Sequence, residues 1–125
     1  MTRLKKAKLL ALGYVDDKLI AVTSLKIPND NYKNRVFNNG NIKDKANHYS
    51  FELGYAVTHK KHRGKGYNFK LNSELISKVK DGNIYATTGN PYMVKLLINL
   101  GFKAIGKEYN GNYNESLQIY ALNIM

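Results

Sequence analysis

The sequence predicts a single domain, residues 1–125, of the α/β (α+β) class with a mixed β-sheet. Three observations predict this class. Residues 50–58 alternate between large apolar side chains and small or polar ones, as in a strand with one buried face. A helical apolar period comes next and a short buried strand follows it, so these two strands are expected to run parallel. A second helix and two closing strands complete the order β-β-β-α-β-α-β-β.

Two strands at the start of the chain are expected to pair as a hairpin. Residues 8–15 and 18–27 are rich in β-formers. Asp16-Asp17 between them fits a tight hairpin turn. Pro28 then ends the second strand, because proline has no N–H to donate to a sheet.

The stretch 28–49 is polar, rich in Asn and weakly patterned. We therefore expect a long loop, and loops of this length in a small domain are usually functional or disordered. Tyr32, Val36 and Phe37 indicate that part of this loop docks on the domain.

The strand 50–58 is predicted to have two different faces. One face is large and apolar and consists of Phe51, Leu53, Tyr55 and Val57. The other face carries one carboxylate among small residues and consists of Glu52, Gly54, Ala56 and Thr58. Because the second face is small, another chain or a ligand has room to lie against it.

Two helices and three strands are predicted in the second half of the chain. The apolar period of the first helix is expected to end at Gly82. The second helix begins at Asn90-Pro91, a capping residue followed by proline, and ends at Gly101. The strands are predicted at 83–88, 103–109 and 116–124.

Composition excludes several kinds of site. The chain has no Cys, which excludes disulfides, a thiolate nucleophile and Cys-ligated zinc. His48, His59 and His62 have no partners at metal-ligand spacing, so no metal site is predicted. No apolar run approaches the roughly 20 residues of a membrane span. The basic start of the chain also lacks the long apolar region of a signal peptide, so we expect a cytoplasmic protein that does not bind membranes.

The net charge of +11 favours an anionic partner, such as nucleic acid, a nucleotide cofactor or an acidic protein surface. A specific anion site is predicted at Arg63-Gly64-Lys65-Gly66, between a strand and a helix. Glycines there allow backbone N–H groups to converge, and the helix N-terminus adds its dipole. The alternative is a solvated basic loop. The spacing matches neither a Walker A motif nor the dinucleotide GxGxxG pattern.

Two segments together resemble the GCN5-related N-acetyltransferase (GNAT) superfamily. The family's pyrophosphate signature is Gln/Arg-x-x-Gly-x-Gly/Ala, and this chain has Arg63-Gly64-Lys65-Gly66-Tyr67-Asn68, with Asn in the last position. The later segment keeps Asn90, Leu96 and Gly101-Phe102 at the family's spacing. The resemblance covers about residues 8–125 and indicates a short member without the usual first strand and the two helices that follow it.

The resemblance implies an acyl-CoA cleft where two parallel strands splay apart, with acetyl-CoA as cosubstrate. The backbone of Val57 and Thr58 would pair with the pantetheine arm, and Asn90 would face that arm. N–H groups of residues 64–68 would hold the pyrophosphate, and Arg63 and Lys65 would add charge. The implied cofactor-binding residues are Val57, Thr58, Arg63, Gly64, Lys65, Gly66, Tyr67, Asn68 and Asn90.

Glu52 is the candidate catalytic base. It precedes Arg63 by eleven residues, and in several histone-type members of the family a catalytic Glu lies at that distance. The alternative is a strand residue that faces solvent or pairs with Lys. The family often places a general-acid Tyr seven residues after the Asn, but this chain has Leu97 there. Tyr92, Tyr85 or water would then assist the leaving thiolate.

The resemblance therefore predicts an acetyl-CoA-dependent N-acetyltransferase that transfers acetyl directly to a primary amine in a ternary complex. One alternative is a GNAT-fold enzyme for a nucleic-acid-linked acceptor, such as aminoacyl-tRNA or a DNA base. Another is a catalytically silent binding module of the same fold. A homodimer is a further expectation, because a partner chain could complete the sheet or cleft of a short member. Several tyrosines fit an acceptor rim, nucleic-acid stacking or half-buried core edges; these are Tyr32, Tyr49, Tyr109 and Tyr113.

Overall fold

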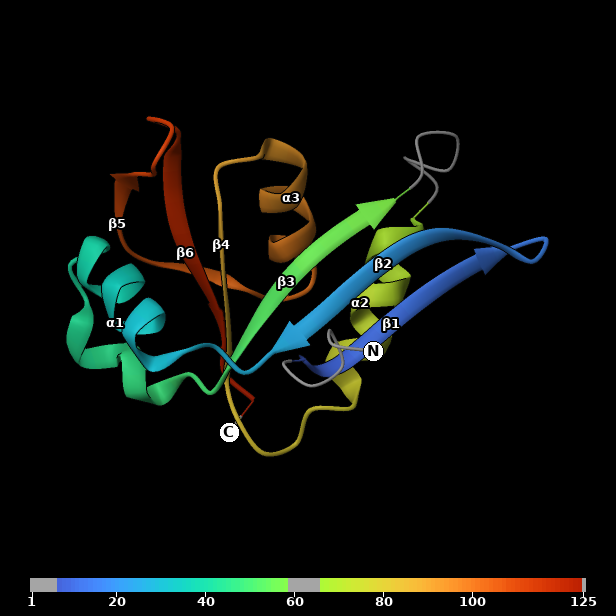
Figure 1. Cartoon of the computed structure of the whole chain (residues 1–125), viewed down its shortest axis with the longest axis horizontal. Coiled ribbons are helices and arrows are strands. Elements are labelled where there is room, and N and C mark those ends of the chain that lie inside the picture. The colour runs from blue at the N-terminus through green and yellow to red at the C-terminus, as the bar shows by residue number, and fades with distance from the viewer. Residues whose placement is uncertain (1–6, 59–65, 125) are drawn as a thin grey trace.

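The computed structural model describes residues 7–58 and 66–124, which form a six-stranded sheet with helices on both faces (Figure 1). The strands are β1 Ala7–Val15, β2 Lys18–Lys26, β3 Phe51–Thr58, β4 Ile84–Thr88, β5 Lys103–Asn110 and β6 Ser116–Leu122. The helices are α1 Asp30–Asn39, the 3₁₀ helix η2 Lys43–His48, α2 Tyr67–Ser77 and α3 Pro91–Asn99. The mixed sheet, its six predicted strands and the two predicted helices are confirmed.

The sheet has the order β1-β2-β3-β4-β6-β5. The predicted parallel pair is confirmed, because β3 and β4 run parallel and the other neighbouring pairs are antiparallel. In the predicted hairpin between β1 and β2, Asp16 and Asp17 have φ angles of 50° and 66°. Two consecutive residues with positive φ are typical of the tight turn that joins antiparallel strands.

Two apolar clusters lie on opposite faces of the sheet. On β4, Ile84 and Ala86 belong to one cluster and Tyr85 belongs to the other, as the alternation of side chains along a strand requires. The first cluster also contains residues of α2 and α3, and the second contains residues of α1 and η2. The sheet is therefore the middle layer of three, with α1 at its β5–β6 end and α2 against β1 and β2 (Figure 1).

The prediction of a long loop over 28–49 is wrong, because α1 and η2 occupy most of it. Asn29 caps α1, and its side-chain oxygen accepts hydrogen bonds from the N–H groups of residues 31 and 32 at 2.8 and 3.3 Å. The predicted docking of this stretch is confirmed: Phe37 is fully buried, 5.6 Å from the ring of Tyr49 and 5.0 Å from the ring of Tyr85. Burial of this one face holds a helix whose other residues are mostly polar.

The predicted ends of the two later helices have different outcomes. Helix α3 ends as expected, since Gly101 has a φ of 101° and its N–H donates to the carbonyl of Ile98 at 3.0 Å. The expected end of α2 at Gly82 is wrong, because the helix ends at Ser77. Gly82 instead packs against Phe51, whose ring would lie 2.6 Å from any β-carbon at position 82. No helix in 7–58 or 66–124 is long and apolar enough to cross a membrane.

Candidate active site

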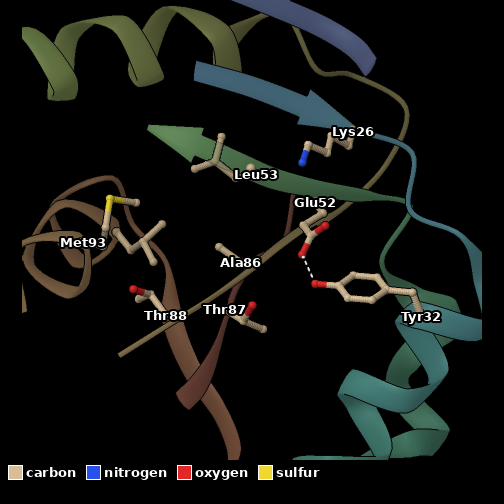
Figure 2. A pocket seen from close by; sticks show the side chains of 10 residues that line it. Lys26, Tyr32, Glu52, Leu53, Ala86, Thr87, Thr88 and Met93 are labelled. Atoms are coloured by element: carbon tan, nitrogen blue, oxygen red, sulfur yellow. Dashed lines mark hydrogen bonds between the residues drawn. The ribbon is translucent and has the colours of Figure 1, made fainter. Parts of the chain in front are cut away.

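A cavity of about 340 Å³ lies where β3 and β4 diverge (Figure 2). The two strands pair at Phe51–Ile84 and Glu52–Tyr85, and the cavity begins directly after this point. Its walls come from both strands and from both helical layers. They are Glu52, Leu53 and Gly54 of β3, Ala86, Thr87 and Thr88 of β4, Met93 and Leu97 of α3, Tyr32 of α1 and Lys26 of β2. The predicted splayed pair of strands is therefore present, and a cavity lies between the two strands.

Glu52 lies at the point of divergence and is partly buried. The hydroxyl of Tyr32 donates a hydrogen bond to its Oε2 at 3.0 Å (Figure 2). Burial raises the pKa of Glu52, whereas the hydrogen bond from Tyr32 and the nearby charge of Lys26 act in the opposite direction. Burial and the Glu52 charge in turn raise the pKa of Tyr32, so the phenol keeps its proton and remains a donor. The structure thus places a carboxylate with an elevated pKa, oriented by a phenol, in the cavity.

Lys26 stands opposite Glu52 in the β2–β3 ladder and lines the same cavity. Its side chain passes over Gly54, where a β-carbon would lie 2.8 Å from Lys26 Cε and 2.9 Å from Ser24 Oγ. The sequence predicted free space on this small face of the strand. At Gly54 that space is taken by the lysine stem, which brings an ammonium group to the cavity.

The tyrosines suggested as assistants of the leaving thiolate do not line the cavity. Tyr92 is 86% exposed at the start of α3. Tyr85 is fully buried in the cluster under α1, and its hydroxyl has no hydrogen-bond partner among the residues that the structure describes. Burial raises its pKa, and the charge of Glu52 adds to that effect. Leu97, at the position where the family often has Tyr, is fully buried and lines the cavity.

Part of the predicted phosphate loop lies outside the described residues, namely Arg63, Gly64 and Lys65. Gly66 caps α2 in a left-handed conformation with a φ of 79°, and a β-carbon at this position would meet no described atom within 4 Å. Tyr67 and Asn68 form the first turn of that helix. Asn68, where the chain departs from the signature, is therefore helical.

Within the part of the chain that the structure describes, the backbone of Val57 and Thr58 has one paired edge and one open edge. On one side these residues pair with Val22 and Ala21 of β2. On the other side, β4 pairs with β3 only as far as Glu52. This arrangement leaves main-chain groups of β3 facing the gap, which is the geometry that a partner in strand-like pairing requires.

Asn90 caps α3 directly after β4. Its side-chain oxygen accepts a hydrogen bond from the N–H of Tyr92 at 2.8 Å, and its own N–H donates to Thr88 Oγ1 at 3.0 Å. The predicted cap is confirmed. The role of Asn90 toward a pantetheine arm stays a prediction.

Tyr32 and Lys26 were not among the predicted catalytic or binding residues. Tyr32 was predicted to help dock the stretch 28–49 and was one of several tyrosines assigned to an acceptor rim, to nucleic-acid stacking or to half-buried core edges; the structure places it in the cavity wall. The apolar residues at 32, 36 and 37 carried a weak helical signal that would have placed Tyr32 on the buried face of a helix.

Comparison with solved structures identifies the fold. No protein-family model matches the sequence, and no curated protein matches it either. A Bacillus anthracis chain solved in complex with acetyl coenzyme A superposes with a TM-score of 0.68 at 17% identity, over 94% of this chain and 62% of the other. The chain has the GNAT fold.

Two further GNAT-fold structures show the same degree of similarity. The ribosomal-protein-S18-alanine N-acetyltransferase of Escherichia coli has a TM-score of 0.65 at 16% identity, over 93% of this chain and 68% of that enzyme. An acetyltransferase of the GNAT family from Streptococcus agalactiae has a TM-score of 0.64 at 15% identity, over 88% of this chain and 62% of the other. The chain thus spans roughly two thirds of the length of the GNAT-fold structures it matches.

Proposed function

We propose that this GNAT-fold chain is an acetyl-CoA-dependent N-acetyltransferase that transfers acetyl to a primary amine by direct attack in a ternary complex. The observation that supports this most is the cavity between β3 and β4, with Glu52 at its inner end. A carboxylate with an elevated pKa, held by a phenol in a partly dry site, is suited to accept a proton from an attacking amine. The similarity to acetyltransferases of the same fold supports the choice of reaction.

The residues present fit acetyl-CoA as the cosubstrate. The open edge of β3 at Val57 and Thr58 offers main-chain hydrogen bonds to the amide groups of the pantetheine arm. The N-terminus of α2, with the left-handed Gly66 as its cap, offers backbone N–H groups and a favourable dipole to the pyrophosphate. Arg63, Gly64, Lys65, Tyr67 and Asn68 complete the proposed phosphate site, as the signature implies.

The proposed transfer needs no covalent enzyme intermediate. The amine nitrogen attacks the carbonyl carbon of the thioester, the C–S bond breaks, and the thiolate leaves with the electron pair. Glu52 accepts the proton that the amine loses, and Tyr32 holds the carboxylate in position for it. The thiolate takes a proton from water and Glu52 returns its proton to the resulting hydroxide, so the products are an N-acetylated amine and coenzyme A. Holding both reactants in one cavity supplies a large part of the acceleration.

Calorimetric titration with acetyl-CoA and an assay for released thiol test the proposal together. Because the chain has no Cys, a thiol reagent reports only coenzyme A, without a background from the protein. Glu52→Gln is expected to bind acetyl-CoA and to lose about 10²–10⁴-fold in kcat/KM. Glu74→Gln, which removes an exposed carboxylate from α2, is the matched control and should leave both unchanged.

Three outcomes decide between the alternatives. If the folded protein does not bind acetyl-CoA, the proposal is wrong. If it binds acetyl-CoA but releases no thiol with any amine in a broad panel, the chain is a binding module. If turnover requires an amine carried by tRNA or DNA and falls steeply with salt, the acceptor is linked to nucleic acid, which the net charge of +11 favours.

A further inference from the structure

The cavity contains an ammonium group for which the proposed chemistry has no use. Lys26 lines the cavity beside Glu52, and Figure 2 shows its Nζ directed toward the same space. Within 7–58 and 66–124, no hydrogen-bond acceptor or carboxylate engages this Nζ. The Oε2 atom of Glu52 is instead engaged by Tyr32. The two opposite charges thus stand side by side in one cavity without forming an ion pair.

Gly54 explains how the lysine reaches this position. A β-carbon at position 54 would lie 2.8 Å from Lys26 Cε and 3.2 Å from Lys26 Nζ. Any larger residue on this part of β3 would push the ammonium away from the sheet and toward solvent. The stem of an exposed lysine is therefore laid along the strand, and its charged end is kept at the cavity.

The cavity wall carries one negative and one positive side chain, Glu52 and Lys26. Among the described residues that line the cavity, these two are charged and the others are neutral. A purely cationic amine would pair with Glu52 and leave Lys26 without an anionic partner, in a chain of net charge +11. An acceptor that also carries an anion satisfies both groups.

We infer that the acceptor is a small primary amine that carries an anionic group close to the amine. Glu52 and Tyr32 face the amine, and Lys26 faces the anion. This inference rests on the proposed acetyltransferase function and names its substrate class. Residues that face each other across an antiparallel ladder have β-carbons about 5 Å apart, which suits an amine and an anion separated by only a few bonds.

The position of Lys26 also favours the reactive form of such an acceptor. An amine attacks a thioester only when it is neutral. A nearby ammonium makes it less favourable for the amine to hold a proton, whereas the same ammonium attracts the anion of the acceptor. One group therefore serves both binding and the protonation state of the nucleophile.

Matched pairs of amines with and without an anion test the inference. Suitable pairs are glycine with methylamine, phenylalanine with phenethylamine and lysine with cadaverine, and aminomethylphosphonate distinguishes a phosphonate from a carboxylate. The readout is the ratio of kcat/KM within each pair, measured by thiol release. The wild-type protein is expected to prefer the anionic member. Lys26→Met is expected to lower that ratio about tenfold, and Lys26→Arg to keep most of it.

Lys18→Met is the matched control, because it removes the same charge from the opposite end of β2. It should leave the ratio unchanged. If Lys26→Met acted only by changing the protonation of Glu52, kcat/KM would fall equally for both members of a pair and their ratio would stay the same. That result would overturn the inference. Turnover of simple amines without preference for an anion would also overturn it and leave the proposed function intact.

Binding without turnover gives a second readout. With coenzyme A present, the backbone amide signals of Glu52 and Gly54 in NMR spectra should shift when glycine is added and should shift less in Lys26→Met. If acetyl-CoA itself does not bind, the proposed function is wrong, and the calorimetric titration shows this before any acceptor is compared. If acetyl-CoA binds and the amide signals respond equally to glycine and methylamine, only the inference about the acceptor falls.

Discussion

The hydrogen bond between Tyr32 and Glu52 ties α1 to β3 at the cavity, and its strength can be measured. The two oxygens are 3.0 Å apart and partly buried, in residues twenty positions apart in the sequence. A double-mutant cycle of Tyr32→Phe, Glu52→Ala and the double variant isolates their interaction. Both single changes are expected to leave the fold intact, because Tyr32→Phe keeps the ring that packs against the core and Glu52 lines the cavity.

The expected coupling follows from the chemistry of the pair. Hydrogen bonds to a charged group contribute about 1.5–3 kcal/mol, and partial exposure favours the lower end, about 1.5 kcal/mol. Unfolding entropy is about 2.1 cal/mol/K per residue, which for 125 residues gives about 260 cal/mol/K. A coupling of about 1.5 kcal/mol therefore corresponds to a difference in Tm of about 6 °C.

The cycle should be measured by urea and thermal unfolding, followed by circular dichroism, at two pH values. At a pH above the raised pKa of Glu52 the carboxyl is charged and the full coupling is expected. Below its pKa, which burial raises above the usual 4.5, the carboxyl is neutral and the coupling should fall to about 0.5–1 kcal/mol. A coupling below about 0.5 kcal/mol at the higher pH would refute the view that this hydrogen bond holds α1 to the site.

Three other predictions concern stability. Glu52→Gln should be more stable than the wild type at neutral pH. Because the pKa of Glu52 is raised in the folded state, its carboxyl contributes stability that is fully present below about pH 4.5 and is lost as the pH rises through the folded-state pKa. The difference between variant and wild type in the free energy of urea unfolding should therefore grow over that pH range. Phe37→Ala should cost about 3–5 kcal/mol of unfolding free energy, whereas Phe69→Ala, at an exposed position of α2, should cost less than about 1 kcal/mol. Asn72→Leu should cost about 1–3 kcal/mol because it strands the buried hydroxyl of Thr23, which donates to Asn72 Oδ1 at 2.6 Å, and adding Thr23→Val should recover part of the loss.

Local signals in the sequence predicted most of the fold. The Asp16-Asp17 turn, the cap at Asn90 and the left-handed Gly101 each depend on residues within a few positions, and all three are found as expected. The strand alternation predicted for 50–58 is confirmed at its start, because Phe51 and Leu53 are buried in the same cluster, but the register shift between β2 and β3 interrupts it beyond Leu53. The parallel pair then followed from the single helix between its strands.

Helix α1 was missed because its own sequence does not favour a helix. Four of its ten residues are Asn, which has a modest helix propensity and competes for backbone hydrogen bonds. Three of its residues are buried, Lys33, Val36 and Phe37, and they hold the helix by contacts with distant parts of the chain. The buried Lys33 even donates to the carbonyl of Tyr49 at 2.9 Å. Tertiary packing of this kind overrides local propensity and leaves little trace in the sequence.

The candidate site shows the same division. Glu52 was predicted from its spacing to the basic turn, but its partner Tyr32 lies on the helix that was missed. Lys26 depends on strand register, which the sequence did not define. Thr23 pairs with Ala56, and an uninterrupted ladder from there would set Lys26 opposite Leu53. Between Thr23 and Leu25 the register shifts, because two steps along β2 oppose three steps along β3, and this extra residue of β3 sets Glu52 opposite Lys26 instead. An irregularity in the β2–β3 pairing thus sets the two charges of the cavity opposite each other, and the acceptor that we infer follows from that shift.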